Sequence, residues 1–174
     1  RLGAYIKIML EELCRFYGGR GKARFTVVRH SNVYGPYDKF GGGGHFFAAS
    51  IGRIDGLKDG DTHTVWGPGT EKRDFLHVSD LIKFMEAVLD KQDYSFEIFN
   101  VGLGRSYSIR EVVEKMIEHS GKQIRIEQDL SKPTLPTQPA LDYTKAKEKF
   151  GWSPAVGLDE GIDLTMDWYR ANRQ

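Results

Sequence analysis

The chain has 174 residues, of which 40% are hydrophobic and 28% are charged, and its formal net charge is +1. This length suits one ordinary domain with a sizeable core. The small net charge provides no overall field for nucleic acid or a membrane surface, so any anion site must come from local residues. The single cysteine, Cys14, excludes an internal disulfide and favours the reducing cytoplasm. No apolar run approaches the ~20 residues of a membrane helix.

The first predicted element is an amphipathic helix over residues 1–16, whose apolar residues recur at helical spacing. It has no upstream cap, and we therefore expect the chain to be part of a longer protein. Cys14 falls within this helix and is expected to be a small core residue. Glycines at 18, 19 and 21 end the pattern, and Phe25–Val28 then reads as a buried strand rich in β-branched residues.

The middle of the chain combines glycine-rich turns with short elements. A glycine-rich loop at 41–44 precedes a predicted helix over residues 46–54. Two short strands follow, at 63–66 and 73–78, separated by a Gly-Pro-Gly turn. Ser79 or Asp80 is expected to cap a helix that runs through Leu89. Residues 96–101 alternate between polar and apolar and predict another strand.

The last third of the chain is mainly helical. Ser108 and Glu111 form a capping box at the start of a helix that reaches about His119. Residues 124–126 predict a strand, and the segment 131–139, with three prolines, predicts an irregular surface stretch. Two helices follow, at 144–150 and roughly 158–171. This alternation predicts an α/β protein, in which strands 25–28 and 96–101 belong to one parallel sheet.

A series of short motifs identifies a family. In chain order they are Asn32-Val33-Tyr34-Gly35-Pro36, Val65-Trp66-Gly67-x-Gly69, Arg73-Asp74-Phe75-x-His77-Val78-x-Asp80, Asn100-Val101-Gly102, Asp142-x-x-Lys145-Ala146 and Gly151-Trp152-x-Pro154. Together they resemble the extended short-chain dehydrogenase/reductase family, NAD-dependent epimerases and dehydratases that act on nucleoside-diphosphate sugars. The segment from Tyr34 to His45 is most similar to the GDP-fucose synthase branch of that family.

The resemblance implies an architecture and a division of the chain. We expect part of a doubly wound, Rossmann-type parallel sheet and a small α/β lobe that binds the substrate. Residues 1–34 would be the end of the dinucleotide-binding domain. Residues 35–174 would be mainly the sugar-nucleotide lobe, with 77–101 returning to the Rossmann sheet. The chain contains no Gly-x-Gly-x-x-Gly fingerprint. Most of the NAD or NADP site is therefore expected in an N-terminal half that precedes this chain.

The resemblance also implies a reaction. The complete protein would epimerise a 4-keto-6-deoxy sugar nucleotide and reduce it with NADPH. A 4,6-dehydratase or a 4-epimerase with bound NAD is the alternative within the family. An inactive nucleotide-sugar-binding module is a further alternative. The expected partners are a nucleoside-diphosphate sugar, with a GDP-sugar as first choice, and a second copy of the chain. The homodimer would form through the helix that carries Lys7 and the helix near 81–89.

By the same resemblance, specific residues are expected at the site. His45 would be an acid/base in the epimerisation, a role that suits imidazole near neutral pH. The remaining substrate contacts would be Asn32, Arg53, Val65, Trp66 and Arg73, of which the arginines suit phosphate oxygens. Lys7, Arg29 and His30 would contact the cofactor, and Lys7 would also belong to the catalytic group. No metal is expected.

Two departures from the family pattern bear on activity and on nucleotide identity. Relatives carry a Tyr-x-x-x-Lys pair on the first helix, whose tyrosine exchanges a proton with the sugar. Lys7 fits the lysine, but Gly3 stands where the tyrosine is expected, and Tyr5 is two residues from Lys7. Residues 135–139 also lack the basic residue found near the nucleotide in GDP-fucose synthases, and Lys132 comes several residues early. The sugar, the nucleotide and the choice between NAD and NADP stay open.

Overall fold

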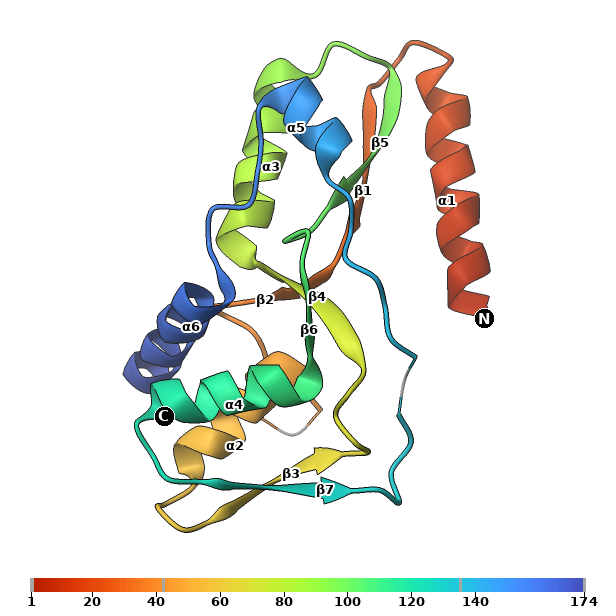
Figure 1. Cartoon of the computed structure of the whole chain (residues 1–174). Helices are drawn as coiled ribbons and strands as arrows, with labels where there is room; N and C mark the ends of the chain where they lie inside the picture. Colours follow the sequence, from red (N-terminus) through yellow and green to blue (C-terminus); the bar gives the residue numbers. More distant parts are fainter. Residues whose placement is uncertain (1, 42, 135, 174) are drawn as a thin grey trace.

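The computed structural model describes residues 2–41, 43–134 and 136–173. Arg1, Gly42 and Leu135, which belong to segments predicted above as a helix, a glycine-rich loop and an irregular stretch, lie outside the described residues, as does Gln174. Helices and strands alternate (Figure 1) in the order α1 (Leu2–Gly18), β1 (Phe25–His30), β2 (Asn32–Tyr34), α2 (Phe46–Gly56), β3 (Thr62–Trp66), β4 (Lys72–His77), α3 (Val78–Lys91), β5 (Phe96–Val101), β6 (Ser106–Ser108), α4 (Ile109–Ser120), β7 (Arg125–Asp129), α5 (Thr144–Phe150) and α6 (Leu158–Asn172). The predicted α/β class is confirmed.

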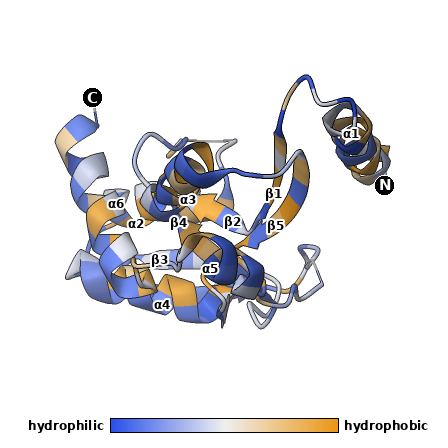
Figure 2. Cartoon of the chain, turned by 90° about the horizontal axis from the view of Figure 1, so that it is seen from above, coloured by the Kyte–Doolittle hydropathy of each residue, from blue (hydrophilic) through white to orange (hydrophobic). Residues whose placement is uncertain are grey.

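Strands β1 and β5 form the parallel pair that the sequence predicts. Phe25 lies opposite Phe96, and His30 lies opposite Val101. Helix α1 lies on one side of this pair, and α3 and α5 lie on the other (Figures 1 and 2). The α3 and α5 side buries an apolar cluster made of Leu76, Phe84, Val88, Phe99, Val101, Ala146, Phe150 and Trp152.

Helix α1 contacts the β1–β5 pair along one stripe of its surface, which includes Gly18 and Glu11. A Cβ added at Gly18 would lie 2.7 Å from the backbone oxygen of Ser95, so the end of the helix approaches the start of β5 closely. About two helical turns before Gly18, the Glu11 carboxylate accepts two hydrogen bonds from the Arg29 guanidinium, at 2.9 and 2.5 Å. Cys14 is only partly buried. The prediction that it is a core residue is wrong, because Gly18 is the only residue of α1 that is buried by the described part of the chain.

The second part of the fold gathers the short strands. Strand β4 pairs in parallel with β2 and antiparallel with β6, while β3 pairs in parallel with β7. Helices α2, α4 and α6 pack together beside these strands (Figure 1). Their shared core is made of Tyr34, Phe47, Ile51, Ile54, Val65, Phe75, Ile109, Val112, Val113, Met116, Leu158, Ile162 and Met166.

The N-terminal cap of α4 is the one that the sequence predicts, whereas the cap of α3 is a different residue. Ser108 and Glu111 form the predicted capping box at the start of α4. Helix α3 begins at Val78, and its cap is His77, whose Nδ1 accepts a hydrogen bond from the backbone N–H of Ser79. The prediction of Ser79 or Asp80 as the cap is therefore wrong.

Asp80 has a longer-range role. Its side chain is fully buried, and its carboxylate accepts hydrogen bonds from the backbone N–H groups of Ala155 and Val156 at 3.0 and 2.9 Å. The indole of Trp152 donates to the Asp80 backbone oxygen at 3.0 Å. Asp80 thereby fixes the segment that leads into α6 against the start of α3. None of the helices in the described part of the chain is long and apolar enough to cross a membrane.

Candidate functional site

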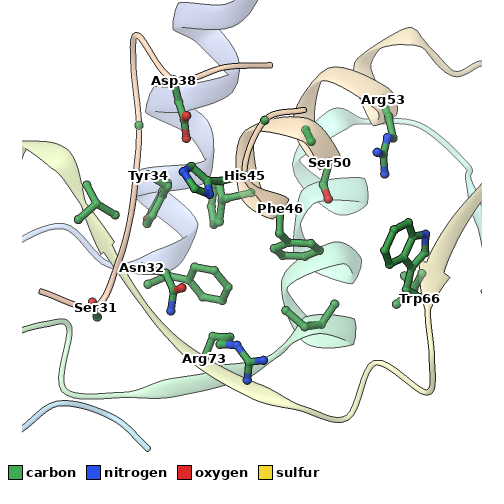
Figure 3. A pocket seen from close by; sticks show the side chains of 18 of the residues that line it. Ser31, Asn32, Tyr34, Asp38, His45, Phe46, Ser50, Arg53, Trp66 and Arg73 are labelled. Atoms are coloured by element: carbon green, nitrogen blue, oxygen red, sulfur yellow. The ribbon is translucent and has the colours of Figure 1, made fainter. Parts of the chain in front are cut away.

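A cavity of about 980 Å³ lies where the carboxyl end of β1, the loop before α2, and strands β3 and β4 meet (Figure 3). The carboxyl ends of parallel strands are where α/β proteins place their ligands. Seven of the nine sequence-predicted site residues line it, and they are His30, Asn32, His45, Arg53, Val65, Trp66 and Arg73. The structure thus brings together residues that are up to 43 positions apart in the chain.

Arg73 is a buried cation in this cavity. Only 7% of the residue is exposed, and its Nη1 donates to the backbone oxygens of Lys72 and Pro136, both at 2.8 Å. Within residues 2–41, 43–134 and 136–173, no carboxylate forms an ion pair with it. Burying an unpaired charge is costly. The remaining N–H groups of Arg73 therefore suit an anionic ligand.

Arg53 and Trp66 form the opposite wall of the cavity (Figure 3). Arg53 comes from the last turn of α2, and Trp66 ends β3 with 56% of its surface exposed. The Nζ of Lys132 lies 5.8 Å from the centroid of the Trp66 ring, which places this lysine at the same wall. Two carboxylates, Asp38 and Glu71, also line the cavity. The cavity as a whole is therefore not strongly positive, and the positive charge is concentrated at the arginine side chains.

The Gly67 turn explains how Lys132 reaches Trp66. Gly67 has a positive φ of 63°, and its N–H donates to the Asp129 oxygen at 2.8 Å. A Cβ at Gly67 would lie 2.0 Å from Cγ2 of Thr134. Only glycine allows the 129–134 segment to cross the turn this closely. In the sequence, Lys132 comes several residues before the position where relatives carry a basic residue near the nucleotide. The spacing does not reveal that the 129–134 segment approaches the Gly67 turn.

Asn32 and His45 lie at the other end of the cavity. The Nδ2 of Asn32 donates to the Asp74 backbone oxygen at 2.9 Å, which leaves its Oδ1 available. His45 precedes the first residue of α2 and makes no capping hydrogen bond with its side chain. Its ring is exposed and lies near Tyr34 and Asp38 (Figure 3). A ring that caps nothing and faces a cavity is available for proton transfer.

The chain matches the family model described as "NAD dependent epimerase/dehydratase family" over residues 4–102. The chain belongs to this family. The predicted resemblance to nucleotide-sugar short-chain dehydrogenase/reductases is thereby confirmed, as is the expected class of fold.

Individual members of the epimerase/dehydratase family show the same relationship. The chain is 36% identical over 172 residues to the Probable GDP-L-fucose synthase 1 of Oryza sativa subsp. japonica, covering 97% of this chain and 52% of that protein. The UDP-glucose 4-epimerase of Thermotoga maritima with UDP-glucose superimposes with a TM-score of 0.78 at 29% identity, covering 97% and 53%. The dTDP-glucose 4,6-dehydratase of Bacillus anthracis with NAD gives 0.68 at 28% identity, covering 84% and 45%. The chain thus spans about half the length of these epimerase/dehydratase relatives.

Lys7 and Arg29 are the two predicted site residues that do not line the cavity. Arg29 pairs with the Glu11 carboxylate, and its contact with the cofactor stays a prediction. The hydrogen bond to this carboxylate raises the pKa of Arg29 and lowers that of Glu11. Lys7 is exposed on α1, one helical turn before Glu11 and on the same stripe.

The cavity also contains residues that are not among the nine predicted site residues. Ser31 follows β1, and its Oγ is buried with no hydrogen-bond partner among the described residues. Tyr34 is 2% exposed, and burial raises the pKa of its hydroxyl, which keeps the group protonated. Ser50 and His63 are both buried and both line the cavity. The family resemblance also implies that Ser31 lies near the nicotinamide. The other three residues look like ordinary core positions in the sequence.

Two further observations concern cations and structural carboxylates. In the described part of the chain, no group of three or more His, Cys, Asp and Glu side chains is placed to hold a metal ion.

Asp74, which precedes the buried Phe75, accepts hydrogen bonds from the backbone N–H groups of Leu103, Gly104 and Leu141 at 2.8, 3.1 and 3.0 Å. Asp74 thus fixes the loops behind Asn32 rather than facing a ligand.

Proposed function

We propose that this chain forms the substrate-binding part of a nucleotide-sugar enzyme. The complete protein would epimerise a 4-keto-6-deoxy sugar nucleotide and reduce it with NADPH. The supporting observation is the buried Arg73 guanidinium, which lines the cavity without a carboxylate partner in the described residues. A diphosphate carries paired oxygens that match the planar donors of arginine.

The diphosphate would lie between Arg73 and Arg53, and the nucleoside would lie against Val65 and Trp66. The exposed indole of Trp66 offers a flat surface on which a base can stack. Lys132, held over this ring, would supply the cation that the 135–139 segment lacks. A GDP-sugar is the first choice of substrate, supported by the sequence identity to a protein named as a GDP-L-fucose synthase.

His45 would transfer protons at the sugar end of the site. A hydrogen on the carbon beside a ketone is acidic enough for a histidine to remove it and for a proton to be returned to the opposite face. This exchange inverts the carbon without oxidation. The free Oδ1 of Asn32 would orient a sugar hydroxyl during it.

The end of β1 fits part of an NAD(P) site. The buried Oγ of Ser31 lacks a partner among the described residues, which indicates that a polar ligand group completes it. Lys7, one turn from Glu11 on the stripe that faces β1, would hold the ribose, and His30 and Ser31 would lie beside the nicotinamide. When bound, the reduced nicotinamide supplies the hydride that reduces the ketone.

Two alternatives stay in view. A 4-epimerase or 4,6-dehydratase with tightly bound NAD is supported by the similar solved structures of those enzymes. A nucleotide-sugar-binding module without turnover is supported by Gly3, because α1 then lacks the family's tyrosine at that position.

We propose that the chain forms a homodimer through α1 and α3. Both helices expose apolar side chains: Leu2, Tyr5, Ile6, Ile8, Met9, Leu10, Leu13, Phe16 and Tyr17 on α1, and Ile82, Met85 and Leu89 on α3. Exposed apolar side chains grouped on a helix are typical of protein interfaces. Light scattering after size exclusion should give the mass of a dimer, and Ile8→Glu should convert it to a monomer.

Calorimetry tests the binding proposal. GDP and UDP are titrated into the chain, into Arg73→Ala, and into the control Arg110→Ala, whose arginine pairs with Glu114 on the surface. At least one nucleotide should bind, about tenfold or more weakly to Arg73→Ala, and unchanged to the control. Heat from neither nucleotide would overturn the proposal.

The reaction is tested with the full-length protein. Addition of GDP-4-keto-6-deoxymannose and NADPH should lower the absorbance at 340 nm, a wavelength that reports NADPH oxidation. No oxidation across a panel of keto-sugar nucleotides would reject the reductase. Release of NAD on denaturation would then favour the epimerase or dehydratase.

A further inference from the structure

Two buried residues with polar side chains line the cavity and form no side-chain hydrogen bond with the described residues. Ser50, on α2, is 2% exposed, and His63, on β3, is 4% exposed. Thr165 shows how the protein usually satisfies such a group, because its hydroxyl donates to the Gly161 backbone oxygen at 2.6 Å. No comparable bond is present for the hydroxyl of Ser50 or the ring of His63 among the described residues. Because both residues line the cavity, their polar groups are available to a ligand that occupies it.

The charge state of His63 restricts which ligand fits. Burial, together with the positive charge of Arg53, lowers the pKa of the His63 imidazole below its ordinary value. The ring is therefore neutral at pH 7 and offers one N–H donor and one nitrogen acceptor. The Ser50 hydroxyl can also donate and accept. A pair of neutral groups with both functions suits a planar amide edge better than a phosphate, which accepts only.

The position of Ser50 and His63 in the cavity also favours a contact away from the end where the sugar is proposed to bind. Ser50 and Arg53 are three residues apart on α2 and face the cavity on the side of Trp66 (Figure 3). His63 lies close enough to Arg53 to feel its charge, and it shares the inner face of β3 with Val65. His45 and Asn32 lie at the other end, where the proposed function places the sugar.

We infer that Ser50 and His63 form a recess that hydrogen-bonds the edge of the nucleobase. The inference rests on the proposed function, because it assumes that a nucleoside diphosphate occupies the cavity. In this arrangement Trp66 covers the face of the base, Arg53 lies at the junction with the diphosphate, and the pair selects the base by its donors and acceptors. These two residues thereby act in nucleotide specificity, whereas Arg73 binds the part that all nucleoside diphosphates share.

The test compares ligands with and without a base. GDP, UDP and inorganic pyrophosphate are titrated by calorimetry into the unmodified chain and into His63→Leu, His63→Gln and Ser50→Ala. Thr62→Val, on the opposite face of β3, is the matched control. His63→Leu and Ser50→Ala should each weaken the preferred nucleotide about tenfold and leave pyrophosphate within about twofold. His63→Gln, which keeps a donor and an acceptor, should retain most of the affinity.

A second measurement does not depend on the folding of any variant. The ring nitrogens of His63 in the unmodified chain are followed by NMR, and their signals should move when GDP or UDP is added but not when pyrophosphate is added. Nucleotide binding that leaves both the His63 signals and the affinity of the variants unchanged overturns this inference alone. Failure of the unmodified chain to bind GDP, UDP or pyrophosphate rejects the proposed function, and the inference with it.

Discussion

Gly161→Ala should destabilise the protein although it replaces a helical glycine with the best helix former. Gly161 lies in the first turn of α6, and a Cβ added there would be 1.9 Å from the hydroxyl oxygen of Tyr34 and 2.8 Å from its Cζ. Ordinary contact begins at 3.4 Å. Tyr34 cannot move away freely, because it is 2% exposed and its ring stacks on Phe47 with centroids 3.7 Å apart.

The magnitude follows from two opposing effects. Overpacking a filled core costs about 1–3 kcal/mol. Replacing glycine by alanine within a helix favours folding by up to about 1 kcal/mol. We therefore expect Gly161→Ala to lower the free energy of unfolding by about 1–2 kcal/mol in urea titrations. Because Tyr34 also lines the cavity, the same variant should bind GDP more weakly.

Two further variants make the reasoning refutable. Gly56→Ala, where a Cβ would meet no atom within 4 Å at the end of α2, is the control and should be neutral or slightly stabilising. Tyr34→Phe removes the oxygen that Gly161→Ala would approach most closely, so the double variant should lose less stability than the sum of the single ones. If Gly161→Ala is as stable as the unmodified chain, the close packing of α6 against Tyr34 is wrong.

Three other predictions follow from particular contacts. Asp74→Asn replaces a carboxylate that accepts three backbone N–H bonds, and urea titration should show a loss of about 2–3 kcal/mol. Lys132→Ala should weaken GDP binding severalfold in calorimetry without changing stability. Burial opposes protonation of His119, but its hydrogen bonds to Asp163 and Asp159 prevail and raise its pKa above 6.5. Its stabilisation is therefore complete below pH about 6.5 and is lost as pH rises through the raised pKa. The stability gap to His119→Gln, about 0.5–1 kcal/mol in acid, should close towards pH 9.

Local patterns were sufficient for most elements of this fold. The alternation in Phe96–Val101 and the β-branched run after Phe25 predicted the two strands that pair in parallel. The Ser108–Glu111 spacing predicted a capping box because both of its hydrogen bonds lie within one turn. Such features depend on neighbours a few residues apart, which the sequence displays directly. The domain boundaries proposed for the chain stay a prediction.

Contacts between distant segments were not predictable in the same way. Asp80 is the clearest case, because its carboxylate bonds to backbone groups 75 and 76 residues later in the chain. The register of β3 with β7 is another case, because it brings the 129–134 segment over Gly67 and Lys132 over Trp66. His63 and Ser50 have the sequence appearance of ordinary polar residues in a strand and a helix. Their role becomes visible only when both are found buried at one cavity.

The contacts of α1 show where Lys7 and Gly3 lie relative to strand β1. Gly18 packs at the start of β5 and Glu11 binds Arg29 near the end of β1, so α1 runs antiparallel to β1. Lys7 therefore lies about 6 Å beyond Glu11, in the direction of the cavity end of β1. Gly3 lies a further turn along the same stripe.

A side chain at Gly3 would meet no obstacle among the described residues, since its added Cβ has no atom within 4 Å. The missing tyrosine is thus not a consequence of packing. Tyr5 does not replace it, because two helical residues turn its side chain roughly 160° away from Lys7. In the proposed function, the described residues would provide cations for a diphosphate and polar groups for a base, whereas Gly3 would leave α1 without the tyrosine that exchanges a proton with the sugar oxygen. On that proposal, the chain would bind the nucleotide even where reduction of the ketone required another proton donor.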